Sequence, residues 1–318
     1  MDRRTFLGTA AMAAAAVAVS HPLSASAFVP EHAASDEIPS PRRKVSEPSP
    51  DGLAVRFLGT GGADWKGPDD RGEHRRLTSL LVEQTFLIDF TATARDMLPE
   101  GLRPEIIFYT HSHRDHYQPK DALEVGVRQV YVNESILQKV KDDFEAAAAQ
   151  LGCPAPIISS LSHGASTRVG DVVVTALPSN HFVSPTEQTQ MYLLEKGGVR
   201  LLYATDTGGL PAHAARIAGI DAHKKPGQPI TALIMEATMG PGHEDDYRLF
   251  SHSSVETVHQ TWRVLNATGR YTPPEGQPVY LTHMARTLHG TQSELDATLP
   301  SPLRAAYDGL DVLFRTTP

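Results

Sequence analysis

The sequence predicts an α/β protein in which two β-sheets pack against each other between outer helices, a four-layer αββα sandwich. Short apolar runs typical of strands recur in clusters along the chain, and helical patterns fill many of the gaps between them. Residues 44–318 are long for one domain but suit a fold with two sheets, and a hydrophobic content of 40% is enough for the cores of such a fold. We therefore expect one folded domain over residues 44–318.

The expected elements follow from the spacing of the apolar residues. Runs with strand character lie at residues 54–58, 79–83, 86–90, 106–109, 130–132, 172–177, 191–195, 201–204, 232–235, 279–281 and 312–314. Patterns with helical spacing lie at residues 91–98, 120–125, 135–151, 211–218 and 255–265.

The first 27 residues have the pattern of an export signal. Arg3 and Arg4 precede Thr-Phe-Leu-Gly and an alanine-rich apolar stretch, and residues 25–27 (Ala-Ser-Ala) form an A-x-A cleavage motif. The apolar stretch is too short for a stable membrane span. The pattern indicates a twin-arginine signal peptide at residues 1–27; an amphipathic helix or a retained anchor is the alternative. We expect a periplasmic or secreted protein, with the twin-arginine export machinery as a partner and no membrane span in the mature chain.

Composition limits the partners further. Residues 28–43 are rich in Pro, Ser and Ala, which predicts a disordered linker. A net charge of −8 leaves no broad basic face, so we expect a small-molecule substrate and no nucleic-acid partner. Cys153 is the only cysteine, so no intrachain disulfide can form and a structural role is expected for it.

The most informative motif directly follows the apolar run at 106–109. His111, His113, Asp115 and His116 place four potential metal ligands within six residues, on the loop after a predicted strand. Two imidazoles that are two residues apart can turn toward one metal, while Asp115 and His116 can reach a second metal nearby. A polar turn with ordinary surface histidines is the alternative, but this spacing favours a metal site.

Three more potential ligands also follow strand-like runs. His181, Asp206 and His283 come after the runs at 172–177, 201–204 and 279–281. Each of them alone would be expected to be a capping or surface residue. Because the ends of strands gather side chains from distant parts of an α/β chain onto one rim, we expect these residues to join the first motif.

The chain from about Leu53 to Phe314 resembles the metallo-β-lactamase superfamily. The resemblance is carried by residues 57–62 (Phe-Leu-Gly-Thr-Gly-Gly), residues 87–90 (Leu-Ile-Asp-Phe), the motif at 111–116 and the three later ligands. It implies that one metal is bound by His111, His113 and His181, that the other is bound by Asp115, His116 and His283, and that Asp206 bridges them. A carboxylate bridge suits two Zn²⁺ ions and also tolerates Mn²⁺ or Fe.

Two further segments resemble one branch of this superfamily. Glu236 in Glu-Ala-Thr and His252 in His-Ser-Ser are similar to elements of ribonuclease Z and of cyclic phosphodiesterases of phosphonate breakdown. The resemblance implies that His252 is a general acid or phosphate-contacting donor and that Glu236 is its partner. Alternatively, His252 is only a polar residue before the helix at 255–265, which Ser253 or Ser254 would cap.

Residues around the expected ligands have two readings each. Asp89 and Thr110 can hold the imidazoles in the required tautomer, although Asp89 could equally be a turn residue at the end of a strand. The basic group Arg71, His74, Arg75 and Arg76 falls in a loop that borders the active site in this superfamily, but a solvated charged loop fits these residues equally well.

The expected chemistry is hydrolysis. Two metal ions close together lower the pKa of a bound water and stabilise the charge that develops on the attacked centre, and Asp115 could also orient the hydroxide. We expect a phosphodiesterase that acts on small or cyclic phosphodiesters. The alternatives are a lactone, β-lactam or other ester hydrolase of the same fold, and a non-catalytic periplasmic metal-binding protein.

Overall fold

The computed structural model describes residues 51–221 and 227–316. The expected signal peptide at 1–27 and the expected linker at 28–43 lie outside these residues. Among the described residues, none of the helices combines the length and the apolar character needed to cross a membrane.

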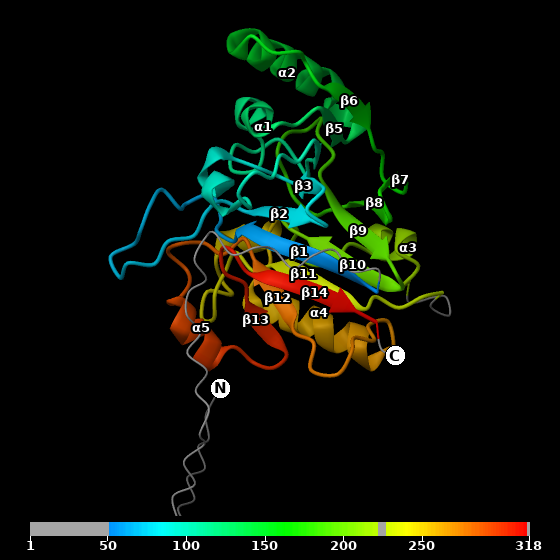
Figure 1. The fold of residues 1–318 in the computed structure, drawn as a ribbon. Coiled ribbons are helices and arrows are strands. Elements are labelled where there is room, and N and C mark those ends of the chain that lie inside the picture. The colour runs from blue at the N-terminus through cyan, green and yellow to red at the C-terminus, as the bar shows by residue number, and fades with distance from the viewer. Residues whose placement is uncertain (1–50, 222–226, 317–318) are drawn as a thin grey trace, which may run out of the picture. The chain divides into compact units, whose positions relative to one another are not determined.

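The first sheet has the strand order β14-β1-β2-β3-β4-β5-β6 (Figure 1). Its strands are β1 (Gly52–Gly59), β2 (Ser79–Val82), β3 (Phe86–Ile88), β4 (Ile106–Phe108), β5 (Gln129–Val132), β6 (Ile157–Ser160) and β14 (Asp311–Arg315). The first three pairings in this order are antiparallel and the last three are parallel.

The second sheet has the order β7-β8-β9-β10-β11-β12-β13 and repeats the same pattern of three antiparallel and three parallel pairings. Its strands are β7 (Ser166–Val169), β8 (Val172–Pro178), β9 (Gln190–Lys196), β10 (Val199–Ala204), β11 (Ala232–Glu236), β12 (Val279–Thr282) and β13 (Leu303–Ala305). The two halves of the domain are therefore alike in topology, although the sequence shows no repeat.

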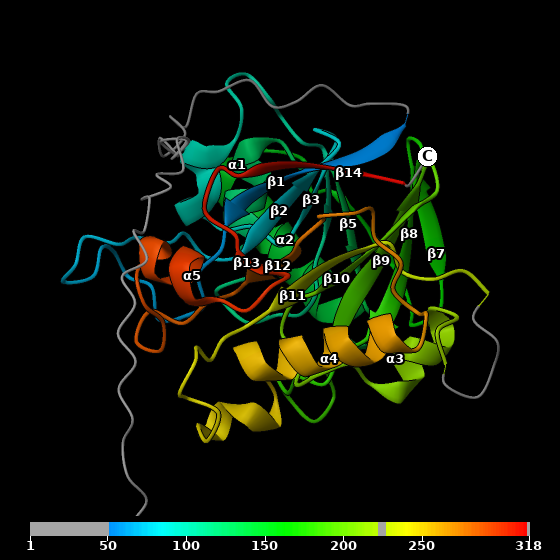
Figure 2. The ribbon, with the colours of Figure 1, turned by 90° about the horizontal axis from the view of Figure 1, so that it is seen from below.

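The helices lie outside the sheets (Figure 2). They are η1 (Ala92–Met97), α1 (Pro119–Val125), η2 (Glu134–Ile136), α2 (Leu137–Leu151), α3 (Ala212–Ile217), η3 (Tyr247–Phe250), α4 (Val255–Ala267) and α5 (Gln292–Thr298), where η denotes a 3-10 helix. Residues on α1 and α2 share a buried cluster with the first sheet, and residues on α3 and α4 share another with the second sheet.

A third apolar cluster fills the space between the two sheets. Leu53, Val55 and Phe57 of β1 point into it because side chains alternate along a strand, and Tyr192 and Leu194 of β9 meet them from the other sheet. The order is therefore helix, sheet, sheet, helix, and the predicted αββα sandwich is confirmed.

Sequence patterns missed five elements, one of which is the 3-10 helix η3, where no residue is buried. The edge strands β6 and β7 are short and largely exposed, so they lack the apolar signal of buried strands, and β13 has three residues. Helix α5 is also short, but its capping box of Thr291 and Glu294 was a readable start signal. The expected helix at 91–98 is the 3-10 helix η1.

Candidate metal centre

The structure brings the ends of four strands to one rim, and the predicted ligands lie there. The loop 111–116 follows β4, His181 follows β8, Asp206 follows β10 and His283 follows β12. Asp206 and His283 have φ angles of 48° and 52°, in the left-handed region. Residues other than glycine rarely adopt this backbone conformation, and where they do, it is typical of functional sites held in place by their surroundings.

The first group of ligands consists of His111, His113, His181 and Asp206, whose ligand atoms all lie within 4.8 Å of one another. His113 Nδ1 lies 3.1 Å from His111 Nε2 and 3.0 Å from His181 Nε2. Asp206 Oδ2 lies 3.2 Å from His111 Nε2. Three imidazoles and a carboxylate oxygen thus face one small space.

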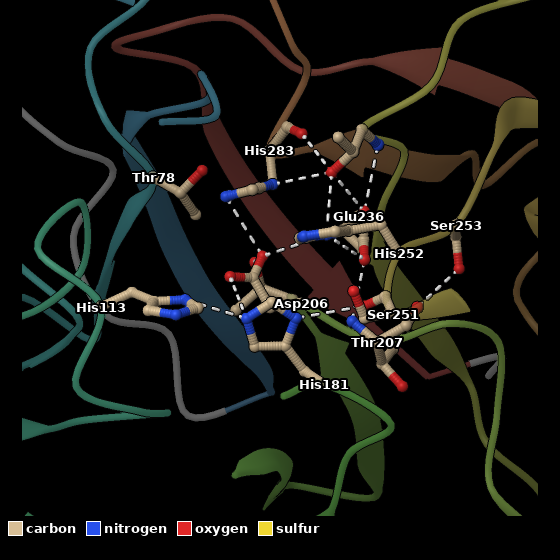
Figure 3. A network of polar contacts seen from close by, with 12 residues as sticks. Thr78, His113, His181, Asp206, Thr207, Glu236, Ser251, His252, Ser253 and His283 are labelled. Carbon is tan, nitrogen blue, oxygen red and sulfur yellow. Dashed lines mark hydrogen bonds and ion pairs between the residues drawn. The ribbon is translucent and has the colours of Figure 1, made fainter. Parts of the chain in front are cut away.

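The second group consists of Asp115, His116, Asp206 and His283, also within 4.8 Å. Asp206 Oδ2 lies 3.0 Å from His116 Nε2, and Asp206 Oδ1 lies 3.1 Å from His283 Nε2. Asp115 Oδ2 lies 3.3 Å from both of these nitrogens. Asp206 belongs to both groups and lies between His181 and His283 (Figure 3).

The environment of His116 indicates that a cation fits this space. Its Nδ1 lies 2.8 Å from Asp89 Oδ2, so Nδ1 carries the proton and Nε2 presents a lone pair. That Nε2 is buried without a hydrogen-bond partner and faces the carboxylate oxygens of Asp115 and Asp206. A lone pair opposite two carboxylates is unfavourable unless a positive charge lies between them.

The imidazoles of His111 and His181 also have partners at Nδ1, on the side away from the ligand group. His111 Nδ1 lies 2.9 Å from Thr110 Oγ1, and the Thr110 hydroxyl donates to Asp89 Oδ2 at 2.7 Å. His181 Nδ1 lies 3.2 Å from the carbonyl of Ser251. Partners of this kind fix the tautomer and leave Nε2 available to a metal.

The fixed charges of the site match this geometry. Burial lowers the pKa of His111 to about 3, so this imidazole is neutral, as a metal ligand must be. Burial alone would raise the pKa of Asp206, but His283 and His116 hold it well below its ordinary value, and Asp206 is ionised. Burial lowers the pKa of His116, but Asp206, Asp115 and Asp89 raise it well above its ordinary value, so this position attracts a positive charge, which bound metal ions would supply.

His252 and Glu236 form a pair beside the second group. His252 Nδ1 lies 3.0 Å from Glu236 Oε1, and the His252 side chain is 15% exposed while that of Glu236 is fully buried. Burial lowers the pKa of His252, but the Glu236 carboxylate raises it more, to about 9. His252 therefore carries a proton at neutral pH.

Thr238 connects this pair to the ligands, a contact that sequence reasoning missed. Its hydroxyl donates to Glu236 Oε2 at 2.6 Å and lies 2.9 Å from His283 Nδ1. Glu236 Oε1 also accepts the backbone N–H of Thr207 at 2.8 Å. Ser254, one of the two serines expected to cap the following helix, caps α4.

A cavity of about 470 Å³ opens beside the second group. Its lining includes His252, His283 and three cationic residues from separate segments: Lys66, Arg248 of η3 and Arg286. Asp64 is the one acidic residue in this lining, and its carboxylate accepts the backbone N–H groups of Arg286 and Thr287. The cavity is therefore positively charged.

The basic group noted in the sequence is largely used to hold the structure together. Arg75 is buried and donates to Thr60 Oγ1 and the Ala306 carbonyl, and Arg76 is paired with Asp96 and Asp308. The cations beside the metal ligands are instead Lys66, Arg248 and Arg286. Position in the sequence did not reveal which cationic residues reach the site.

The sequence matches the protein family described as Beta-lactamase superfamily domain over residues 85–284, which is more than half of the chain. The chain belongs to this superfamily. Together with the two ligand groups, this membership makes it a metal-dependent hydrolase with a dinuclear His/Asp site.

Solved structures share the fold at low sequence identity. Zn²⁺-bound PqqB from Methylobacterium extorquens has a TM-score of 0.59 at 18% identity, covering 81% of this chain and 99% of that one. YhfI from Bacillus subtilis, a metallo-β-lactamase fold protein, has a TM-score of 0.58 at 15% identity, covering 83% and 100%. Unliganded yeast PDE1 has a TM-score of 0.52 at 12% identity, covering 83% and 99%. No curated protein matches in sequence.

Proposed function

We propose that this protein is a phosphodiesterase that hydrolyses small or cyclic phosphodiesters with two divalent metal ions. The observation that carries the proposal is the pair of His252 and Glu236, which places a protonated imidazole beside the second group of ligands. Zn²⁺ suits a set of imidazole and carboxylate ligands, and the structurally similar PqqB is Zn²⁺-bound.

The residues fit the ligand roles that the sequence implied. His111, His113 and His181 would hold one ion, Asp115, His116 and His283 the other, and Asp206 would bind both. When bound, the ions supply a hydroxide nucleophile near neutral pH and stabilise charge on the attacked phosphorus. Besides holding an ion, the Asp115 carboxylate could orient that nucleophile.

His252 is suited to protonate the leaving group. Because Glu236 accepts the Nδ1 proton, Nε2–H is the donor that remains for a substrate oxygen. The buried carboxylate stabilises the imidazolium before the transfer, and the leaving alkoxide takes its proton as the P–O bond breaks. Such a donor contributes typically about 10²–10⁴-fold.

The charge of the cavity favours an anionic substrate. Lys66, Arg248 and Arg286 face the space beside His252 and His283, where a phosphodiester would carry its negative charge. A simple lactone carries no such charge, so this cavity favours the phosphodiesterase over the lactonase alternative.

The proposal is tested by the dependence on the leaving group. His252→Ala should keep both metals but lose about 10²–10⁴-fold in turnover of a dialkyl phosphate, and much less with bis(4-nitrophenyl) phosphate, whose leaving oxyanion is already stable. The matched control is His259→Ala, which replaces a histidine on the adjacent helix α4. This variant should lose little turnover of either substrate.

Two outcomes would contradict the proposal. Equal losses on both substrates would remove His252 from the role of acid. No phosphodiesterase activity in the metal-replete protein, together with rapid lactone or β-lactam hydrolysis, would establish the alternative, and no turnover of any of these substrates would support the non-catalytic one.

We also propose that the chain is exported by the twin-arginine pathway, because of the pattern at residues 1–27. Replacing both Arg3 and Arg4 by Lys should leave precursor in the cytoplasm, since the guanidinium pair is a different donor from two ammonium groups. Normal processing and export of the doubly substituted precursor, measured by fractionation and immunoblotting, would contradict export by this route.

A further inference from the structure

Large apolar side chains are exposed next to the metal centre. Among the described residues, Phe182, Tyr247, Leu249 and Phe250 are 65%, 75%, 44% and 87% exposed. We call these four residues the apolar rim. Burying such side chains is favourable, so a surface that leaves several large apolar side chains in water is typical of a binding site.

The two segments of the rim are joined at the ligands. Phe182 directly follows His181, and η3 ends at Phe250, two residues before His252. The carbonyl of Ser251 lies 3.2 Å from His181 Nδ1, which connects the segments at the metal ligand itself. His181 and Ser251 are drawn together in Figure 3.

The apolar residues of η3 are not part of a core. No residue of this short helix is buried, and its start is held by polar contacts: Asp246 accepts the backbone N–H of Arg248 at 2.9 Å and pairs with its guanidinium at 3.1 Å. Tyr247, Leu249 and Phe250 therefore contribute little to folding stability, and packing does not explain their apolar character.

The same helix also contributes to the charged cavity. Arg248 lines the cavity together with His252 and His283, and its guanidinium carbon lies 5.5 Å from the centroid of the Tyr247 ring. A substrate that places its phosphate near Arg248 and the ligands would carry its next substituent toward η3. Cationic and apolar contacts thus follow each other outward from the metal centre.

We propose that the apolar rim binds a flat aromatic ring carried by the substrate on the alcohol next to the scissile phosphate. Three of its four residues are aromatic, and aromatic pairs gain energy beyond the burial of area through stacked or edge-on contacts. The inference rests on the proposed phosphodiesterase function and narrows its substrate class to phosphodiesters of alcohols that carry an aryl or heteroaryl ring.

The test uses binding and not turnover. Calorimetry of the zinc-loaded protein should show phenyl phosphate binding about tenfold more tightly than methyl phosphate. Phe182→Ala and Phe250→Ala should each weaken phenyl phosphate by about 3- to 10-fold and leave methyl phosphate unchanged. Ile157→Ala is the matched control, because Ile157 is 70% exposed but lies on the edge strand β6 of the other sheet, and it should change neither affinity.

Other results would overturn the inference. Equal affinity for phenyl and methyl phosphate would show that the rim recognises no ring. If cyclohexyl phosphate bound as tightly as phenyl phosphate, the rim would recognise a ring but not its aromatic character. If Phe250→Ala abolished self-association in sedimentation, or binding to phosphatidylcholine vesicles, without changing the affinity for phenyl phosphate, the rim would serve a second copy or a membrane.

Failure of the proposed function is distinguishable from these results. If the zinc-loaded protein discriminates phenyl from methyl phosphate and loses this discrimination in the rim variants, the inference about the rim is supported even without diester hydrolysis. Hydrolysis of diesters with no preference for rings would contradict the inference alone.

Discussion

Replacing Asp89 by Asn should disturb both groups of metal ligands, although Asp89 belongs to neither. The Asp89 carboxylate is fully buried, and its Oδ1 accepts the backbone N–H of Thr110 at 2.8 Å. Its Oδ2 accepts the Thr110 hydroxyl at 2.7 Å and faces His116 Nδ1 at 2.8 Å. An asparagine fits the left-handed backbone of this position, which has a φ of 54°, so the change acts mainly on hydrogen bonding.

The amide of the variant has one orientation that keeps the backbone contact. Its oxygen must face the N–H of Thr110, which cannot reverse its role, so the NH₂ group faces Thr110 Oγ1 and His116 Nδ1. His116 then accepts at Nδ1 and carries its proton on Nε2, where it cannot bind a metal. The Thr110 hydroxyl turns to donate to His111 Nδ1, which shifts the tautomer of the second imidazole as well.

The expected effect is at the upper end of what such outer groups contribute. Loss of a partner behind a metal ligand typically costs 10–100-fold in metal affinity. Because Asp89→Asn acts on His116 directly and on His111 through Thr110, we expect about 100-fold, or about 2.7 kcal/mol, in zinc binding by competition titration. Burial lowers the pKa of His116, but Asp206, Asp115 and Asp89 raise it well above its ordinary value, so nitrogen-15 NMR of the metal-free variant is recorded at high pH, where His116 is neutral and should be protonated at Nε2.

A matched control separates this effect from general destabilisation. Asp308→Asn also changes a buried aspartate, which accepts from Thr60 Oγ1 and the backbone N–H of Arg76 and belongs to neither ligand group. Asp308→Asn should change zinc affinity by less than about threefold, since the hydrogen bonds of Asp89 and Thr110 to the metal-binding imidazoles remain in place. Unchanged zinc affinity in Asp89→Asn, with His116 still protonated at Nδ1, would refute the tautomer argument.

Three further perturbations have defined outcomes. Asp206→Ala removes the carboxylate that both ligand groups share, so bound metal should fall from about two ions per chain to less than one by elemental analysis; two retained ions would be incompatible with a bridging role. Lys196→Met leaves the buried Glu83 carboxylate without its partner at 2.6 Å, and the free energy of unfolding in urea should fall by about 3–5 kcal/mol; a much smaller loss would show that water reaches the pair. Burial lowers the pKa of His252, but Glu236 raises it from 6.5 to about 9 overall, which corresponds to about 3 kcal/mol in the metal-free protein. This stabilisation is fully present below pH 6.5 and is lost as pH rises through about 9, and a His252→Gln variant with the same pH dependence of unfolding would argue against it.

The sequence by itself determined the layered fold and the ligand set. Buried strands such as β8 and β10 contain apolar runs that can be recognised in the sequence. Every residue of β10, for example, is buried. The spacing of His111, His113 and His116 was likewise local, because one loop after one strand carries all three. The signal peptide at residues 1–27 remains a prediction.

Only the tertiary structure decided which side chains act on these ligands. Thr238 ends the Glu-Ala-Thr segment and had no expected role, but its hydroxyl lies between Glu236, at the end of β11, and His283, directly after the neighbouring strand β12. Arg248 of η3 and Arg286 reach one cavity although 38 positions separate them in the sequence, while Arg75, nearer the first strands, is buried elsewhere. The physical reason is that hydrogen bonds and charge depend on distances in space, which strand register and loop packing set, whereas apolar periodicity and ligand spacing are written along the chain itself.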